Sequence, residues 1–370
     1  VVVDSDLNSV DGVGNQVVNG SDLNVVVGAG NQVIDSDLNF VTGIGNQIDP
    51  SYFNTVTGSF NQVNNSFFNG VIGNRNIVTN SILNGVSGSL NTVTNAIANG
   101  VSGWANNVEG DYGVAALNTV DGSFNNVTDS SLNFVSGAGN QVTGYWNGAS
   151  LNQGVLNNVV GTGNRINEGG DLNQVFGTYN QVHGTSRSGV LLGSNNQTFA
   201  HRATVIGQSS LAAGRSSIAI GDRASAWTFA TSAMGRGAAA IGPGSTAIGA
   251  FSRSYAPNTV SVGSPLNPRR VTNVDDPIRG TDAVNYRTLL DVRREALKGV
   301  AISQAMETFM PDPDKQFRLT AGVGYYEGYG AIGVTGAGRL DEQGTALYFG
   351  LGASDEDHVA AKAGVSFQFD

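Results

Sequence analysis

Apolar side chains alternate with small or polar ones along four segments between residues 315 and 369. In the last segment one face carries Val359, Ala361, Ala363, Val365, Phe367 and Phe369. Alternation with a period of two predicts β-strands whose two faces meet different surroundings. The apolar face suits lipid. The opposite face is rich in glycine, which predicts close packing inside a barrel lumen at Gly322, Gly324, Gly350, Gly352 and Gly364.

These four predicted strands are too few to close a barrel. Hydrocarbon offers no partners for backbone N–H and C=O groups, so only helices and closed barrels span a membrane. Three copies of the chain would supply 12 strands and leave no open edge. We therefore predict a homotrimer with a 12-stranded β-barrel, four strands per chain, in contact with outer-membrane lipid. A small soluble sheet covered by the preceding helix is the alternative.

A helical pattern precedes the strands. Apolar and small residues recur at alternating steps of three and four at Leu289, Val292, Ala296, Gly299, Ser303 and Met306. This spacing predicts a coiled-coil seam, in which small residues near the end let three helices share a narrow lumen. Pro311 and Pro313 are expected to stop the helix.

The first half of the chain carries a repeat. Up to about residue 183, Asn recurs mostly in steps of seven and eight, as at Asn8, Asn15, Asn24 and Asn31, and Val or Ile stands two residues later. Glycine closes the longer half of each 15-residue unit. Stiff, branched residues favour strands, and stacked Asn side chains can bond to the coils above and below. The pattern predicts a β-solenoid.

Aromatic residues gather on successive coils of this repeat, namely Tyr52, Phe53, Phe60, Phe67 and Phe68. An apolar patch of this size in water is a liability. We favour a position at the axis of a trimer, and an exposed adhesive stripe is the alternative.

From about residue 190 the period shortens to 14, marked by Gly193, Gly207, Gly221, Gly235, Gly249 and Gly263. Two segments stand out, which consist of Ser217, Ile218, Ala219, Ile220 and Gly221, and of Thr246, Ala247, Ile248 and Gly249. They resemble the S-V-A-I-G core in the heads of YadA-type trimeric autotransporter adhesins. The resemblance implies a left-handed parallel β-roll and makes these nine residues candidates for ligand binding.

Two further stretches extend the resemblance. The first resembles the neck of such proteins, at Val271, Thr272, Asn273, Val274, Asp282, Ala283, Val284 and Asn285. Residues 297–306 resemble the helix that enters the family's anchor. The expected domains are an Asn-rich head (1–189), a YadA-like head (190–265), a neck (266–285), a coiled-coil stalk and lumen helix (286–310) and a barrel anchor (311–370).

Composition and charge argue against several classes of partner and site. The 370 residues include 52 Gly and no Cys, and the net charge is −10. Lys occurs only at Lys298, Lys315 and Lys362, so we expect no basic patch and no nucleic-acid partner. His183, His201 and His358 lie in unrelated contexts, which predicts no catalytic centre, no metal site and no cofactor. The sequence starts in mid-repeat at Val1, which we interpret as a mature or truncated start.

The functional expectation follows from the resemblance. It implies a bacterial surface adhesin of type V secretion, which passes its head through its own C-terminal anchor with the help of the barrel-assembly machinery. The anchor would lie in the outer membrane, and the exposed head would attach to extracellular matrix, to a host cell or to another surface. An ice-binding solenoid or a phage-type fibre is the alternative for the repeats.

Overall fold

The computed structural model describes residues 1–110, 115–144, 154–167, 170–184, 186–342, 344–354 and 358–367. Phe369, expected on the apolar face of the last strand, lies outside these ranges. The chain divides into two units, residues 1–269 and 270–370. Each is described by itself.

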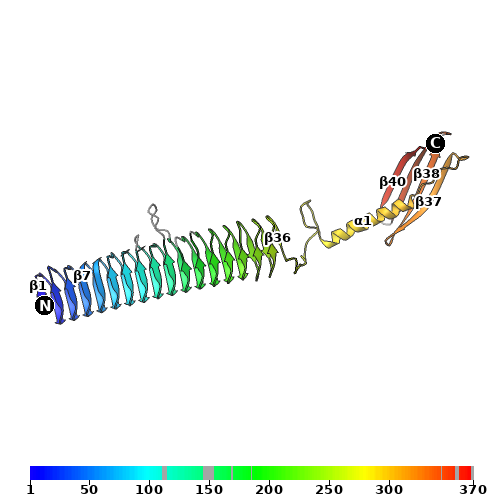
Figure 1. Cartoon of the computed structure of the whole chain (residues 1–370). Coiled ribbons are helices and arrows are strands. Elements are labelled where there is room, and N and C mark those ends of the chain that lie inside the picture. The colour runs from blue at the N-terminus through cyan, green and yellow to red at the C-terminus, as the bar shows by residue number, and fades with distance from the viewer. Residues whose placement is uncertain are drawn as a thin grey trace. The chain divides into compact units, whose positions relative to one another are not determined.

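The first unit is a solenoid in which each coil adds one strand to each of two parallel sheets (Figure 1). We call the sheet with the longer, mostly five-residue strands sheet 1. Within the described residues its strands are β2 (Ser9–Val13), β4 (Val25–Ala29), β6 (Phe40–Ile44), β8 (Thr55–Ser59), β10 (Gly70–Asn74), β12 (Gly85–Ser89), β15 (Gly100–Trp104), β18 (Thr119–Ser123), β20 (Phe134–Ala138), β22 (Asn158–Thr162), β24 (Gln174–Thr178), β26 (Val190–Ser194), β28 (Thr204–Gln208), β30 (Ile218–Asp222), β32 (Ser232–Met234), β34 (Thr246–Ile248) and β36 (Val260–Ser261).

The other sheet, sheet 2, has mostly shorter strands. Within the described residues they are β1 (Val2–Val3), β3 (Gln16–Val18), β5 (Gln32–Ile34), β7 (Gln47–Tyr52), β9 (Gln62–Phe67), β11 (Ile77–Thr79), β13 (Thr92–Thr94), β16 (Asn107–Glu109), β19 (Asn126–Thr128), β21 (Gln141–Thr143), β23 (Arg165–Ile166), β25 (Gln181–Val182), β27 (Gln197–Thr198), β29 (Leu211–Ala212), β31 (Ser225–Ala226), β33 (Ala239–Ala240) and β35 (Arg253–Ser254). A short pair, β14 (Ala96–Ile97) and β17 (Ala115–Ala116), lies apart from this ladder.

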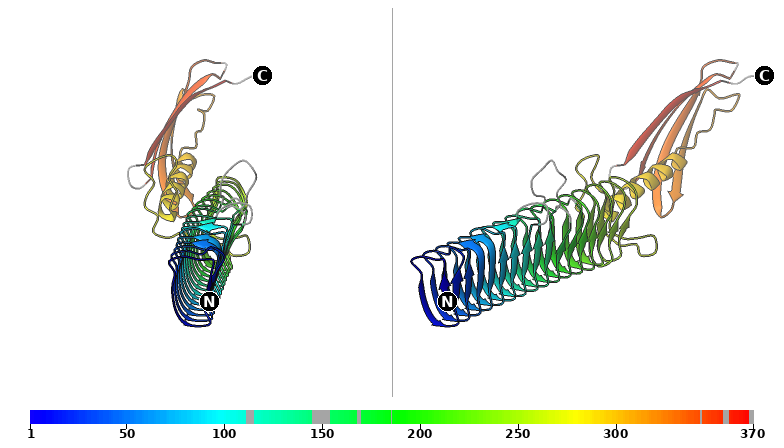
Figure 2. Two further views of the ribbon diagram at one scale, coloured as in Figure 1. Left: turned by 90° about the vertical axis from the view of Figure 1, so that its left-hand side faces the viewer. Right: turned by 60° about the vertical axis from the view of Figure 1, so that its left-hand side comes forward.

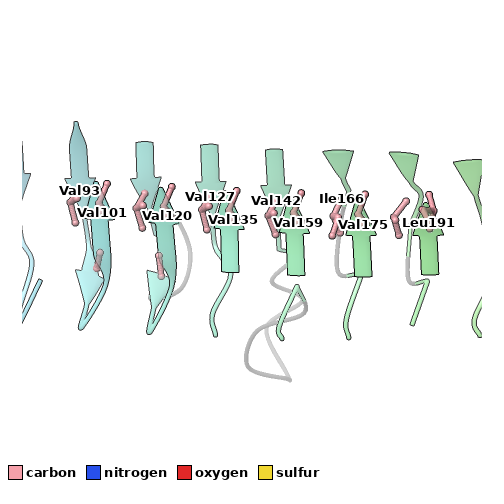
Figure 3. Close-up of a cluster of buried hydrophobic side chains, with 14 of the residues drawn as sticks. Val93, Val101, Val120, Val127, Val135, Val142, Val159, Ile166, Val175 and Leu191 are labelled. Carbon is pink, nitrogen blue, oxygen red and sulfur yellow. The ribbon is translucent and has the colours of Figure 1, made fainter. Parts of the chain in front are cut away.

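Equivalent positions of neighbouring coils pair with one another throughout the first unit. Val41 of β6, for example, pairs with Val26 of β4 and with Val56 of β8. The coils superpose closely in the end-on view of Figure 2. Each coil contributes one inward side chain from each sheet to a narrow apolar row, as at Val93 and Val101 (Figure 3). The predicted β-solenoid is therefore confirmed.

The Asn residues form two buried ladders along the corners of the coils. The backbone N–H of Asn31 donates to Oδ1 of Asn15 at 3.0 Å, and its Nδ2 donates to the same oxygen at 3.1 Å. Nδ2 also donates to the carbonyl oxygen of Gly43 on the following coil at 2.9 Å. One amide thus joins three coils and pairs backbone groups that the narrow core would otherwise leave without partners.

The change of period alters both the core and the corners. In the 14-residue coils Ala219, Ala233 and Ala247 take the inward positions that valine fills earlier, and all three are buried. Ser217 replaces the corner Asn, and its hydroxyl donates to the carbonyl oxygen of Gly214 within the same turn. A shorter corner side chain and a smaller core residue suit a coil that is one residue shorter.

The glycine that closes each longer strand is required by the stacking. Gly58 has a φ of +125°, a backbone conformation that residues with a side chain rarely adopt. A Cβ atom at this position would also overlap the carbonyl group of Gly73 on the next coil. The recurrent glycines therefore reflect both backbone conformation and the close approach of successive coils.

Within the described residues, the second unit contains one helix and a four-stranded antiparallel sheet. The helix is α1 (Tyr286–Ala305), and the strands are β37 (Phe317–Tyr326), β38 (Tyr329–Arg339), β39 (Ala346–Ser354) and β40 (Val359–Ser366), which pair in chain order. Helix α1 lies along one face of the sheet (Figure 1). Within the described residues no helix has both the length and the apolar character needed to cross a membrane.

Helix α1 is shorter than the coiled-coil pattern suggests. It begins after Asn285, whose side-chain oxygen accepts a hydrogen bond from Thr288 N at 2.9 Å, as an N-cap does. It ends at Ala305, ahead of Pro311. The proline stop is therefore not what ends it. Side chains from the sheet hold the backbone that follows Ala305 in a non-helical course.

Candidate functional site

The glycine-rich face of the sheet packs against α1. A Cβ atom at Gly324 would overlap the carbonyl oxygen of Ala301, and one at Gly322 would lie 2.6 Å from the carbonyl oxygen of Ala305. At Gly352 a Cβ would lie 2.7 Å from Cγ2 of Ile302. These three predicted lumen glycines therefore give the helix room to approach the sheet.

The remaining predicted lumen glycines lie on the same face but meet side chains of the sheet. A Cβ at Gly350 would lie 2.9 Å from Cγ2 of Thr335, and one at Gly364 would overlap the ring of Tyr348. Gly333, which the sequence reasoning did not select, does meet the helix, at 2.5 Å from the carbonyl oxygen of Ala305. It pairs with Gly322 across the strands, so cross-strand register was the signal that would have found it.

Polar side chains of this face hold the chain where it leaves the helix. Thr335 Oγ1 donates to the carbonyl oxygen of Glu307 at 2.8 Å, Lys362 Nζ donates to that of Met306, and Arg339 Nη2 donates to that of Pro311 at 3.3 Å. These contacts give partners to carbonyl groups in the segment that follows the helix, which ends at Ala305. The sequence reasoning did not identify this role for any of the three side chains.

The predicted coiled-coil seam faces away from the sheet. The buried positions of α1 are Lys298, Ala301, Ile302 and Ala305. Of the six seam residues, Leu289, Val292, Ala296, Gly299 and Ser303 are exposed on the single chain, and Met306 is buried. The outer face of the sheet is likewise apolar and exposed, as at Val323 and Ile332. The single chain therefore leaves two apolar surfaces of this unit uncovered.

The predicted neck is built around two carboxylates. Asp276 accepts hydrogen bonds from Arg287 Nη2 at 2.6 Å and from Asn285 Nδ2 at 2.7 Å. Asp282 Oδ2 accepts from the backbone N–H groups of Ile278 at 2.9 Å and of Arg279 at 2.8 Å. These two carboxylates close a loop onto the start of α1 and fix the direction in which the helix begins.

Electrostatics in the neck favour the ionised carboxylates. The Arg287 guanidinium and the Asn285 amide hold the pKa of Asp276 below its usual value. The backbone N–H groups of Arg279 and Ile278 lower the pKa of Asp282 in the same way. Of the other predicted neck residues, Asn273 has a φ of 62°, and Val271, Thr272, Ala283 and Val284 are exposed.

The predicted ligand-binding segments lie at equivalent positions of sheet 1, in β30 and β34, which are two coils apart. Ser217, Ala219 and Ala247 are fully buried, whereas Ile220 and Ile248 point outward from sheet 1 and are exposed. Ile218 and Thr246 are half-buried on the same outward side. Gly221 and Gly249 have positive φ and close the strands. A ligand would reach only the outward residues of these segments, for which binding remains a prediction.

The aromatic cluster of the first half lies outside the coil. Phe53 and Phe68 stack at 4.7 Å between ring centroids, and Tyr52 stacks on Phe67 at 5.3 Å. Phe60 is exposed on the opposite corner. The single chain does not cover these rings. A position at the trimer axis and an exposed adhesive stripe therefore both stay predictions.

His183 and His201 belong to neighbouring coils of the solenoid, and His358 belongs to the second unit. His183 stacks on Phe199 with 4.1 Å between ring centroids. Burial, assisted by Arg165, lowers the pKa of His183. Among the described residues, no group of three or more His, Asp or Glu side chains is placed to bind a metal ion.

Comparison with known proteins addresses the C-terminal unit directly. Residues 309–369 match the family model of the YadA-like membrane anchor domain. This match assigns the C-terminal part of the chain to the YadA-like anchor family, and residues 1–308 lie outside it. The matched range contains the four strands β37 to β40. The YadA-like anchor indicates anchoring in the outer membrane, and the family is adhesive rather than enzymatic.

Two other comparisons complete these findings. No curated protein sequence is significantly similar to the chain. Among solved structures, the collagen-binding domain of the Yersinia adhesin YadA aligns with 54% of this chain and 86% of its own length, at 16% identity and a TM-score of 0.29. Trimers and coiled coils are the norm of the YadA-like family.

Proposed function

We propose that three copies of this chain form one surface adhesin. Their sheets close a 12-stranded barrel in the outer membrane, three α1 helices share its lumen, and the solenoids form a head outside the cell. The head attaches the cell to extracellular matrix, to host cells or to other surfaces. The chain would pass its own head through the anchor, with the barrel-assembly machinery as a partner.

The observation that carries this proposal is the pair of open edges at β37 and β40. Each of these strands pairs with one neighbour only in the single chain. An open edge cannot lie in hydrocarbon, because its backbone groups would have no partners. Closure through β37 of one copy and β40 of another pairs every strand and places the glycine-rich face inside. The exposed seam of α1 then meets the other two helices.

The test expresses the chain, with a signal sequence, in a bacterium that has an outer membrane. We expect a trimer that resists detergent until heated, and cells that attach to wells coated with decellularised matrix. A monomer in the membrane fraction would contradict the trimeric anchor. A heat-resistant trimer on cells that do not attach would contradict the adhesive role and leave the anchor standing.

A further inference from the structure

Charge is distributed unevenly along the solenoid. Residues 1–186 contain 13 acidic residues and two Arg, whereas residues 187–270 contain eight Arg, one Asp and neither Glu nor Lys. The net charges of these segments are therefore −11 and +7. The overall net charge hides this difference. The expectation that the chain offers no basic patch is wrong for the 14-residue coils.

Several of these arginines have no carboxylate partner. Arg202, Arg215 and Arg223 are exposed and form no ion pair in the part of the chain that the structure describes. The single carboxylate of the segment, Asp222, lies 3.3 Å from Arg236 and is thus already paired. Arg215 stands on the coil that follows His201, since Ser216 N donates to the His201 carbonyl oxygen at 2.9 Å. Arg202 and Arg215 thus lie at the same corner of successive coils, whereas Arg223 lies at the other corner, where its backbone N–H donates to the Gln208 carbonyl oxygen.

An aromatic column lies beside the corner of Arg202 and Arg215. Phe199, Ala213, Trp227, Ile241 and Tyr255 occupy equivalent positions at the ends of successive sheet 2 strands. The ladder continues through them, with Trp227 N donating to the Ala240 carbonyl oxygen at 3.0 Å. The exposed fractions of Phe199, Trp227 and Tyr255 are 50%, 51% and 55%. From Phe199 onward the aromatic rings therefore recur at every second coil, about 9.6 Å apart at the usual strand spacing. On the coil before Phe199, the ring of His183 stacks on it.

Each aromatic residue has a polar neighbour two positions earlier on the same face. Gln197 precedes Phe199, Ser225 precedes Trp227, and Arg253 precedes Tyr255 and donates to its hydroxyl at 3.2 Å. The intervening coils carry Leu211 and Ala239 at the polar position. The outer surface of sheet 2 therefore repeats every two coils, with one ring and one hydrogen-bonding group in each repeat.

The outer faces of sheet 1 and sheet 2 in these coils suit different kinds of partner. Sheet 1 carries an unbroken apolar column at Leu192, Ile206, Ile220, Met234 and Ile248. Other copies of the chain can cover such a column without burying charge. The face of sheet 2 adjoins arginines with no carboxylate to meet them, and burying an unpaired charge is costly. Sheet 2 therefore stays open to a ligand when copies meet through sheet 1.

We propose that this face, defined by Phe199, Trp227 and Tyr255 with Arg202, Arg215 and Arg253, binds a linear acidic polysaccharide lying along the solenoid. The inference rests on the proposed adhesive function and names the ligand class of that function. Aromatic faces stack on the C–H faces of sugar rings, and the planar guanidinium fork binds carboxylate or sulfate groups in a bidentate manner. A repeat of two coils suits a polymer with one acidic group per disaccharide.

The spacing favours a glycan over a nucleic acid. Successive bases of a stacked strand lie roughly 3.4 Å apart, so rings at every second coil do not match them. A sugar polymer with an extended disaccharide repeat presents its ring faces at a longer interval. Uronic and sulfated sugars share the required chemistry, and the choice of probe separates them.

The experiment measures retention of cells that display the full-length chain on immobilised heparin, on polygalacturonate and on neutral dextran. We expect retention on one or both acidic polymers, little on dextran, and loss as salt rises. The double variant R202S/R215S should bind about tenfold more weakly than R75S/R165S, which removes two arginines from the acidic coils. W227A/Y255A should likewise bind more weakly than F40A/F134A, which truncates two exposed rings of sheet 1.

Surface amount and heat-resistant trimer, measured for every variant, show that folding is intact. Equal retention of R202S/R215S and R75S/R165S cells would overturn the proposal. So would equal competition by polyglutamate and heparin, or stronger competition by duplex DNA. Digestion of a matrix coating with glycan lyases separates this inference from the proposed function. Attachment that survives digestion overturns the glycan ligand and keeps the adhesin, whereas no attachment before digestion counts against the adhesin itself.

Discussion

Nδ2 of Asn61 lies 3.0 Å from Oδ1 of Asn46 on the preceding coil and 2.8 Å from the carbonyl oxygen of Gly73 on the following coil. Asn61 Oδ1 in turn accepts from Asn76 N at 3.0 Å. All these groups lie in the buried corner ladder, where water cannot replace a missing partner. The Asn ladder is therefore as much a part of the core as the valines are.

The first prediction concerns this ladder. Asn61→Ala leaves buried donors and acceptors on three coils without partners, so we expect local destabilisation of about 2–4 kcal/mol. Hydrogen exchange on the full-length trimer measures it through the amide of Asn76, whose protection should fall. The control is Asn74→Ala, which removes an exposed side chain from β10. Equal protection in both variants would refute the structural role of the ladder.

The second prediction concerns the anchor. Gly324→Leu places a side chain where the backbone of α1 lies, so the helix cannot keep its position against the sheet. We expect little or no heat-resistant trimer in the membrane fraction. Val323→Leu changes the neighbouring, outward position of the same strand and should leave the trimer intact, because that side chain is exposed. Loss of trimer in V323L but not in G324L would mean that the two faces are reversed.

The third prediction concerns pH. Folding lowers the pKa of Asp276 through Arg287 and Asn285. The carboxylate therefore contributes its stabilisation above its unfolded pKa of about 3.9 and loses it as pH falls through the lower folded value. Protection of the first amides of α1 should stay constant from about pH 7 to 5 and decline only below about pH 3.9. Asp276→Asn should remove most of this decline, and an unchanged pH profile would contradict the assignment.

The fourth prediction concerns the aromatic stack. If Phe53 and Phe68 lie at a trimer axis, cysteines at position 68 of three copies come close enough to form disulfide-linked dimers under mild oxidation. Phe68→Cys tests this on the full-length chain, and Thr42→Cys, on the outer face of sheet 1, is the comparison. Cross-linking at position 42 but not at position 68 would show that the rings are free for an adhesive role instead.

The solenoid could be predicted from the sequence because its register repeats. A single Val or Asn says little about the fold. Val26, Val41 and Val56, however, stack on one another, so every coil needs an apolar residue of similar size at this position. The four-stranded sheet could likewise be predicted, because the alternation of apolar with small or polar residues extends over whole strands. In both cases a local pattern and the tertiary contact coincide.

Contacts between distant segments could not be predicted in this way. The end of α1 depends on Lys362 and Thr335, which follow it in the chain and bond to carbonyl groups after Ala305. Gly333 became recognisable only through its pairing with Gly322. The basic coils were missed for a different reason, because charge was summed over the whole chain before it was examined along the solenoid.

The register between successive coils determines how the solenoid can change in length. Each coil meets its neighbours through equivalent positions, so removal of residues 55–69 would join surfaces that already fit, with Asn54 followed by Gly70 in place of Thr55. Unequal recombination between repeated gene segments can thus shorten or extend the protein by whole coils, each about 4.8 Å. The length of the solenoid can then evolve without a change in the 14-residue coils, on which the proposed ligand lies.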